Sequence, residues 1–132
     1  MKKERSFKFY RKVFENAPDA YYLNDLKGNF IDGNKAAEEM TGYKKEELIG
    51  KNMVRLGLLP KTHLPMAISN IAKNALGRKT GPDEFVLIRK DGEKIHVEIT
   101  THPVSIEGKK MVLGIARDIS KRKESDIYFH KL

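Results

Sequence analysis

The chain has 132 residues, no cysteine and a formal net charge of +8. This length fits one domain with its own core. The absence of cysteine excludes disulfides, thiolate metal sites and a cysteine nucleophile, and it fits the reducing cytoplasm, where we expect the protein to act. No apolar run approaches the roughly 18 residues that a transmembrane helix needs, so we expect no membrane segment in this chain.

Most of the excess positive charge lies at the two ends of the chain. Residues 1–12 hold six basic residues against one acidic residue, and residues 121–132 hold four against two. Residues 13–120 hold 16 against 15. A nucleic-acid-binding domain instead concentrates positive charge on a folded face. We therefore predict no nucleic-acid partner and interpret the two ends as solvated connecting helices, while a membrane surface or an acidic partner stays open.

The first half of the chain predicts a helix, a hairpin and two short helices. These elements are expected, in order, over residues 6–16, 20–25, 30–33, 35–41 and 44–50. In the first helix, Phe7, Tyr10 and Phe14 share one apolar stripe. Asn34 is a good N-cap for the helix that follows the hairpin. Glycines and a proline then predict an irregular stretch over residues 52–60.

The second half predicts a longer helix, three strands and a terminal helix. These are expected over residues 64–76, 83–90, 93–104, 110–119 and 120–132. In the longer helix Leu64, Ile68 and Ile71 repeat at helical spacing. Asp91-Gly92 between the first two strands is a strong hairpin signal. Hairpins at both ends with helices between them predict an α+β fold, in which an antiparallel sheet carries its helices on one face.

The Asp91-Gly92 turn also predicts which side chains share a face of the sheet. If these two residues form the whole loop, the inner face holds the pairs Ile88–Ile95 and Val86–Val97, with Ile99 further along. Phe85 and Leu87 then lie on the outer face, which is too apolar to be freely exposed. We expect the stripe of Phe7, Tyr10 and Phe14 to cover it, from the same chain or from a second copy, and this predicts a homodimer.

Two blocks of the sequence resemble the PAS (S-box) family of sensor domains. Residues 13–52, VFENAPDAYYLNDLKGNFIDGNKAAEEMTGYKKEELIGKN, resemble its opening half, and residues 84–123, EFVLIRKDGEKIHVEITTHPVSIEGKKMVLGIARDISKRK, resemble its last three strands. The resemblance implies a five-stranded antiparallel sheet that cups a small cavity closed by short helices, with helices flanking it at both ends. It also implies a signalling role, often in sensor histidine kinases, cyclases and transcription regulators.

The end of the second block is similar to the family's D-I-T linker motif. Asp118, Ile119 and Ser120 occupy its three positions, with serine in place of threonine. Asp or Ser can cap the next helix by accepting hydrogen bonds from its free N–H groups. We interpret these residues as a signal relay from strand to helix. The chain then divides into a flanking helix (1–16), a PAS-like sensor domain (17–119) and the start of an output helix (120–132).

The resemblance places a cavity between the helices and the sheet. Its expected lining is Met53, Leu56, Leu64, Ile68, Ile71, Leu76, Val97, Ile99 and Ile115. The same residues fit an ordinary filled core, in which methionine is adaptable packing. The sequence therefore leaves open both a small apolar ligand and an empty core.

Metal and cofactor chemistry is weakly supported by the sequence. Without cysteine, the flavin–thiol photochemistry of light-sensing PAS domains is excluded. Haem needs an axial ligand, and the longer helix contains no histidine, although His63 lies just before it. His96 and His102 are six residues apart on one strand, about 20 Å, which is too far for one metal ion. We predict no metal site and expect neither haem nor flavin.

The leading interpretation is a sensing or dimerisation module of a larger signal-transduction protein, which acts on a downstream effector such as a histidine kinase. The alternative is an adaptor with an empty core that binds proteins through the outer sheet face. We predict no catalytic activity for this segment, because its carboxylates show no functional pairing. Those considered are Asp25, Asp32, Glu38, Glu39 and Asp83.

Overall fold

The computed structural model describes residues 2–131, with side chains described over 8–128 and at 130. Its elements, in chain order, are α1 (Lys2–Asn16), β1 (Ala20–Asn24), β2 (Phe30–Gly33), α2 (Lys35–Thr41), α3 (Lys45–Leu48), a 3-10 turn η1 (Lys61–His63), α4 (Leu64–Ala75), β3 (Thr80–Ile88), β4 (Lys94–Ile106), β5 (Lys109–Asp118) and α5 (Ser120–Lys131). The predicted helices and strands are all present. The first helix begins earlier than expected, and β3 begins three residues earlier.

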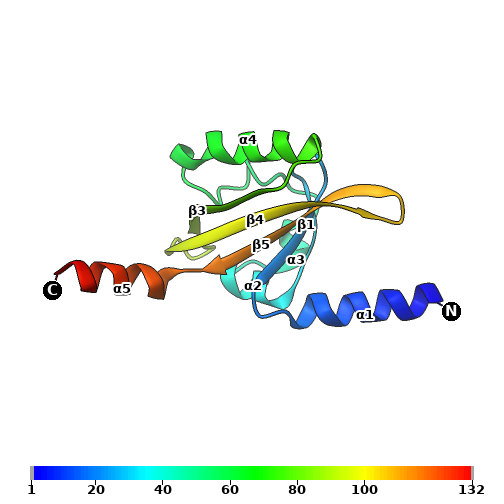
Figure 1. Cartoon of the computed structure of the whole chain (residues 1–132), viewed down its shortest axis with the longest axis horizontal. Coiled ribbons are helices and arrows are strands. Elements are labelled where there is room, and N and C mark those ends of the chain that lie inside the picture. The colour runs from blue at the N-terminus through cyan, green and yellow to red at the C-terminus, as the bar shows by residue number, and fades with distance from the viewer. Residues whose placement is uncertain (1, 132) are drawn as a thin grey trace.

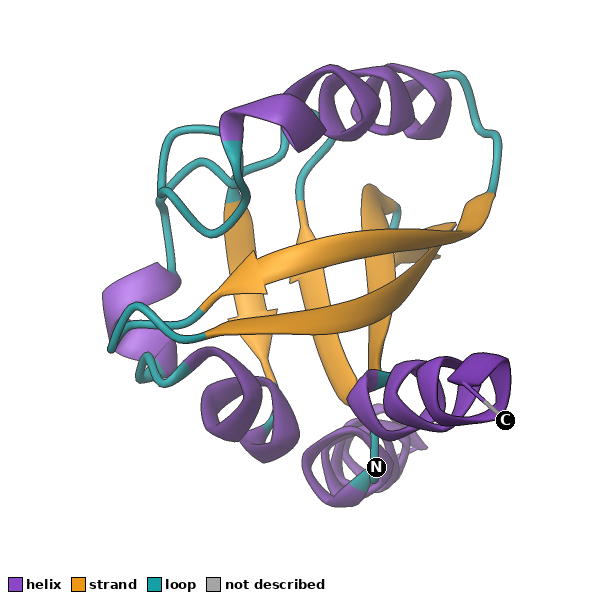
Figure 2. Cartoon of the chain, turned by 90° about the vertical axis from the view of Figure 1, so that its left-hand side faces the viewer, coloured by secondary structure: helices purple, strands orange, loops and turns teal. Residues whose placement is uncertain are grey.

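The five strands form one antiparallel sheet in the order β2-β1-β5-β4-β3. This confirms the predicted α+β fold. The helix α4 lies across one side of the sheet (Figure 2). The helices α1 and α5 leave the domain at opposite ends (Figure 1). Within residues 2–131, no helix is both long and apolar enough to cross a membrane.

The hairpin between β3 and β4 differs from the prediction by one residue. Arg89 pairs with Glu93, and the Gly92 N–H donates to the Arg89 carbonyl at 2.9 Å, so the loop has three residues rather than two. Gly92 takes φ +89°, as the third position of such a loop requires. A shift of one residue moves every side chain to the opposite face.

The predicted sheet faces are therefore exchanged on β3. Phe85 lies opposite Val97, and Leu87 lies opposite Ile95. Phe85 and Leu87 are buried in the core, with Phe85 only 4% exposed. The expectation that they form the outer face is wrong, and Val86 and Ile88 lie on that face instead.

The aromatic stripe of α1 packs on its own chain. Phe14 is buried, and its ring meets the outer-face ring of Tyr21 edge to face at 6.3 Å. Tyr10 stacks on Phe14 with 5.5 Å between ring centroids. The side chain of Phe7 lies outside the described residues. A different pair, Phe9 and Val13, is exposed on α1, with Phe9 at 72%.

Candidate ligand cavity and signalling joint

A largely apolar cavity of about 80 Å³ lies between the sheet and the helices α2 and α3. All five strands line the cavity on one side, and α2, α3 and the segment after α3 line it on the other. The main apolar lining is Ala20, Tyr22, Phe30, Ala37, Leu48, Met53, Leu58, Leu59, Leu87, Val97, Ile99 and Ala116. An apolar cavity of about 150 Å³ can bind benzene, so this one admits only a very small molecule as it stands.

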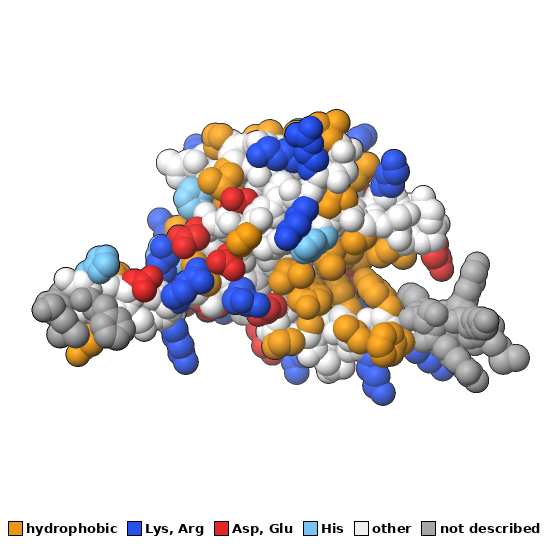
Figure 3. Space-filling model, viewed as in Figure 1, with side chains coloured by type: hydrophobic (Ala, Val, Ile, Leu, Met, Phe, Trp, Pro, Cys, Tyr) orange, Lys and Arg blue, Asp and Glu red, His pale blue; other side chains and the backbone are white. Residues whose placement is uncertain are grey.

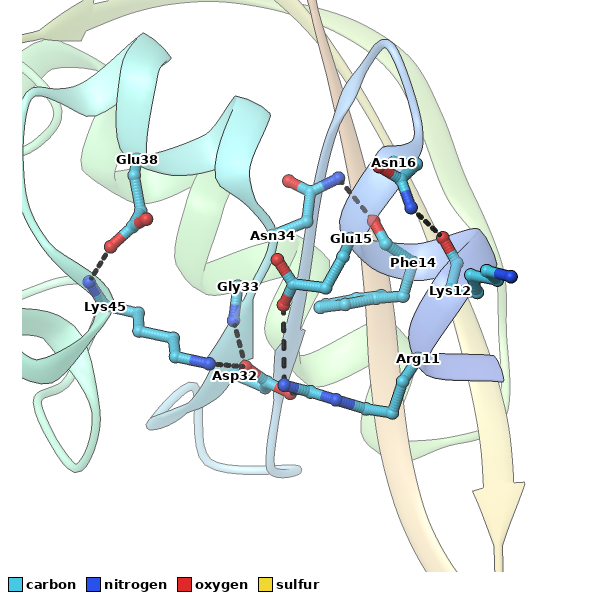
Figure 4. Close-up of polar contacts among 10 residues, drawn as sticks. All are labelled: Arg11, Lys12, Phe14, Glu15, Asn16, Asp32, Gly33, Asn34, Glu38 and Lys45. Atoms are coloured by element: carbon cyan, nitrogen blue, oxygen red, sulfur yellow. Dashed lines mark hydrogen bonds and ion pairs between the residues drawn. The ribbon is translucent and has the colours of Figure 1, made fainter. Parts of the chain in front are cut away.

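One side of this cavity carries a chain of charged groups (Figure 4). Asp32 at the end of β2 accepts a hydrogen bond from Arg11 of α1 at 2.6 Å. Its other oxygen lies 3.8 Å from the Lys45 ammonium group. Asp32 and Lys45 both line the cavity, together with Glu38, which accepts from the Lys45 N–H at 2.8 Å. Asp32 therefore connects α1, the cavity and α3.

Asn34, directly after β2, ties four segments together. It is fully buried, at 0% exposure. Its side-chain oxygen accepts from the N–H groups of Tyr21 at 3.0 Å and Ala37 at 2.9 Å. Its amide group donates to the carbonyls of Phe14 at 2.9 Å and Asp19 at 3.0 Å. Asn34 is thus the predicted N-cap of α2, and it also fixes the end of α1 beside the cavity.

A second cavity, of about 40 Å³, lies between α4 and the sheet. Its polar lining is Tyr22, Asn24, Asn70, Asn74 and Thr101. The Asn74 amide donates to the Thr101 hydroxyl at 2.8 Å and to the Arg78 carbonyl at 2.9 Å. The Thr101 hydroxyl also bonds to that of Thr80. Burial raises the pKa of the Tyr22 hydroxyl, which therefore stays protonated.

Tyr22 reaches this region because its cross-strand partner is a glycine. Gly114 lies opposite Tyr22, and a Cβ at Gly114 would overlap the Tyr22 ring. The ring therefore lies flat over the β5 backbone, where any larger residue would displace it.

The structure distributes the nine predicted cavity residues over several environments. Met53, Val97 and Ile99 line the larger cavity. Ile71 lines the second cavity, together with Met53 and Ile99. Leu56 packs against the core, and Leu64 is half-buried without lining either cavity.

Three of the predicted lining residues lie elsewhere. Ile68 and Leu76 are exposed and line neither of these two cavities, with Leu76 at 75%. Ile115 pairs with Tyr21 on the outer face of the sheet. The error in α4 arises because Asn70 and Asn74 face inward, where Asn74 finds partners at Arg78 and Thr101. Spacing alone favoured the apolar Ile68 over these amides.

The histidines do not gather near either cavity wall. The 3-10 turn places His63 so that its Nδ1 accepts from the Val86 N–H at 3.1 Å, with its ring 5.8 Å from that of Phe85. All four histidines are among the described residues, and none of them lines either cavity. Among the described residues, no three His, Asp or Glu side chains are placed to hold a metal ion. The cavities thus offer no histidine ligand for haem, and about 80 Å³ is far below the volume of a drug-sized site.

The joint between β5 and α5 is capped as its residue types predict. The Asp118 carboxylate accepts from the Ser120 N–H at 2.9 Å. Ile119 is buried, and its N–H donates to the His96 carbonyl at 3.0 Å. The first turn of α5 is also held to the sheet, because Lys123 lies 2.6 Å from Glu84 and Arg122 lies 3.1 Å from Glu98.

The fold and site define a sensor-type domain, in which a sheet encloses a small cavity and continues into an outgoing helix. The PAS domain family matches residues 18–121 of this chain. The chain therefore belongs to the PAS domain family. It is a signalling module, and the PAS domain itself is a sensor rather than a catalytic unit.

Sensors and a solved PAS domain are similar to this chain. It is 33% identical over 122 residues to the oxygen sensor protein DosP of Escherichia coli (strain K12). The matched region is 80% of this chain and 15% of DosP. It is 28% identical over 120 residues to the methyl sulfide methyltransferase-associated sensor of Methanosarcina acetivorans. That match includes 89% of this chain and 12% of the sensor. The PAS domain of a protein from Colwellia psychrerythraea is 32% identical with a TM-score of 0.73, over 88% of this chain and 98% of that one.

The matched proteins are much longer than this chain. The chain spans between 12% and 28% of the length of the curated relatives it matches. One of them, sporulation kinase A of Bacillus subtilis, is 26% identical over 123 residues. The likeness therefore concerns one domain of each relative.

Proposed function

We propose that this chain senses a small ligand in the larger cavity and passes the change through Asp118, Ile119 and Ser120 to an effector domain of a longer protein. One observation carries the proposal. Ala116 of β5 lines the cavity, and Asp118, two residues later, caps α5. A shift of β5 at the cavity wall is transmitted directly to the start of the helix, because a strand is stiff over two residues.

The relatives support the finer parts of this proposal. Two of them are sensors by name, and sporulation kinase A is a kinase by name. We propose an effector of that kind, such as a histidine kinase, and a cytoplasmic location. The corresponding division of the chain is a flanking helix (1–16), the sensor domain (17–119) and the start of the output helix (120–132).

Native mass spectrometry of the purified chain tests the sensing role. We expect a discrete mass above that of the protein, which represents a retained ligand. The variant Ala116→Leu fills the cavity and should lose that mass. Ala72→Leu makes the same change on the exposed side of α4 and should keep it. A protein without a retained ligand would favour an adaptor, and equal retention by both variants would place the ligand elsewhere.

We also propose that two copies associate through α1. Phe9 and Val13 form an exposed pair one turn apart, beside the buried stripe that packs on the domain. Light scattering should report a dimer for the unaltered chain and a monomer for Phe9→Ser combined with Val13→Ser. Lys8→Ser combined with Lys12→Ser is the control, because both lysines are exposed on the same helix. A dimer that survives the loss of Phe9 and Val13 would contradict this interface.

The adaptor function remains the second candidate, and α4 favours it. Ile68 is exposed on α4, and Leu76 is exposed directly after the end of the helix. Residues 48–82 hold six basic residues and no acidic residue. Hydrophobic and basic side chains accordingly lie together over α4 in Figure 3. This face suits a protein segment that combines apolar and acidic side chains, whereas Phe85 and Leu87 no longer supply an apolar outer sheet face.

A further inference from the structure

The inner side of α4 carries two amides, Asn70 and Asn74, beside the apolar Ala67 and Ile71, while Ile68 is exposed on the helix. Asn74 is buried at 3% exposure, and Asn70 also faces the second cavity. Asn24 of β1 closes the same cavity from the sheet side and is equally buried. Burying the amides of Asn24 and Asn74, with Asn70 half-buried beside them, costs free energy unless their polar atoms find partners. Their partners therefore indicate what the cavity accommodates.

Each of these three amide groups donates at least one hydrogen bond within the protein, whereas their oxygens accept none from the described residues. The amide groups of Asn24, Asn70 and Asn74 donate to the Asp25 carbonyl, the Asp83 carboxylate, and the Arg78 and Thr101 oxygens. Among the side chains described, over residues 8–128 and at 130, no hydrogen bond reaches the three amide oxygens or the Tyr22 hydroxyl. Three acceptors and one buried hydroxyl therefore surround one small cavity.

The two cavities are neighbours with a movable partition. Tyr22, Met53, Leu59 and Ile99 line both of them. Their volumes are about 80 Å³ and about 40 Å³, so together they approach the roughly 150 Å³ that accepts benzene. Met53 is unbranched and adapts to irregular space, so it can move aside at low cost. The joined space has an apolar end under α2 and a polar end under α4.

The polar end selects against charged groups. Of the residues that the structure describes, no Lys, Arg, His, Asp or Glu lines the second cavity. A buried carboxylate or ammonium group there would have no ion partner, and its desolvation would oppose binding. A hydroxyl or N–H group, in contrast, can donate to an asparagine oxygen and lose little on leaving water.

We propose that the ligand of this domain is a small uncharged molecule with an apolar ring or chain of about six carbon atoms and one hydroxyl or N–H group, which donates to Asn70, Asn74 or Asn24. The apolar part lies in the larger cavity, and the polar group lies under α4. This inference rests on the proposed sensing function and names the chemical class of what is sensed.

Three probes of equal ring size test the ligand class: phenol, toluene and benzoate. In NMR titrations of the chain, phenol should shift the Met53 methyl group and the side-chain amides of Asn70 and Asn74. We expect toluene to bind about three- to tenfold more weakly than phenol, because it lacks the donor. Benzoate should produce no saturable shift at these groups. Equal binding of phenol and toluene, or tighter binding of benzoate, would overturn the proposal.

A variant pair locates the polar contact. Asn70→Leu should reduce the affinity for phenol to that for toluene, while Ser69→Leu, on the exposed side of the same helix, should leave both unchanged. If Asn70→Leu still binds phenol more tightly than toluene, and phenol does not shift the Asn24 and Asn74 amide signals, the assignment of the polar contact to these asparagines is wrong. The comparison of phenol with toluene on the unaltered chain holds even if Asn70→Leu does not fold.

Failure of this inference and failure of the sensing function give different results. A purified chain that retains a charged or much larger ligand, and binds none of the probes, refutes the ligand class but keeps the sensor. A chain that retains nothing and binds none of the probes refutes both, and points to the adaptor.

Discussion

Replacing Asn34 tests whether one buried amide joins α1, β1 and α2 beside the cavity. In Asn34→Asp, the carboxylate can still accept from the Tyr21 and Ala37 N–H groups, which both bond to one oxygen. It cannot donate to the Phe14 and Asp19 carbonyls, which the amide group now satisfies. The substitution therefore removes two donors from a fully buried site and places a negative charge against two carbonyl oxygens.

The expected cost is large for a change of one atom. Each buried carbonyl left without a donor costs about 1–3 kcal/mol, so the loss of two gives about 3 kcal/mol at neutral pH. This is a substantial part of a total stability of about 5–15 kcal/mol. An unfolding entropy of about 2.1 cal/mol/K per residue over this chain converts about 3 kcal/mol into a decrease in Tm of about 11 °C.

Urea and thermal denaturation of Asn34→Asp measure this loss, with Asn16→Asp as the control. Asn16 is exposed, and its amide bonds only the Lys12 carbonyl of its own helix, so its change should stay within about 0.5 kcal/mol. The deficit of Asn34→Asp should shrink in acid, because a protonated carboxyl can donate to one of the two carbonyls. A loss below about 1 kcal/mol at neutral pH would refute the argument that these four hydrogen bonds hold the segments together.

Three further predictions follow from the sheet and its turns. Gly114→Ala should cost about 1–3 kcal/mol in urea denaturation, and adding Tyr22→Leu should recover most of it; additive losses would contradict the close contact. Phe85→Ala should cost about 3–5 kcal/mol and Val86→Ala about 1 kcal/mol, whereas the reverse order would contradict the sheet register. Burial alone would raise the pKa of Asp25, but hydrogen bonds from Asn29 and Lys27 lower it. The Asp25 carboxylate therefore contributes fully to folding stability above its unfolded pKa of about 3.9, and this contribution is lost as the pH falls through the lower folded pKa. The loss of stability caused by Asp25→Asn should accordingly be larger at about pH 7 than at about pH 3.

The register of the β3–β4 hairpin shows why a strong local signal can mislead. Asp91-Gly92 suits a two-residue loop, but it also suits the end of a three-residue loop in which Gly92 takes the left-handed conformation. Both loops satisfy the local backbone. The choice between them depends on whether Phe85 and Leu87 or Val86 and Ile88 face the helices, and the larger buried area of the first pair decides it.

The orientation of α4 was not predictable from helical spacing. Ile68 lies on a helical stripe with Leu64 and Ile71, whereas Asn70 lies on a stripe with Ala67 and Asn74, and hydrophobicity alone selects the first stripe. The amide of Asn74 instead pairs with Thr101, which is 27 residues away in the chain. A buried hydrogen-bond network therefore fixed the rotation of the helix, and its partners come from a different element.

The sequence by itself determined the order and type of the elements, the N-cap at Asn34, the capped joint at Asp118 and Ser120, and the family. Each of these depends on residues within a few positions of one another, where backbone sterics and capping hydrogen bonds act. Only the tertiary structure decided the sheet register, the inward amides of α4, and the contact of α1 through Arg11 and Asp32. These depend on side chains far apart in the sequence, because a face of a helix or strand acquires its direction only from what packs against it.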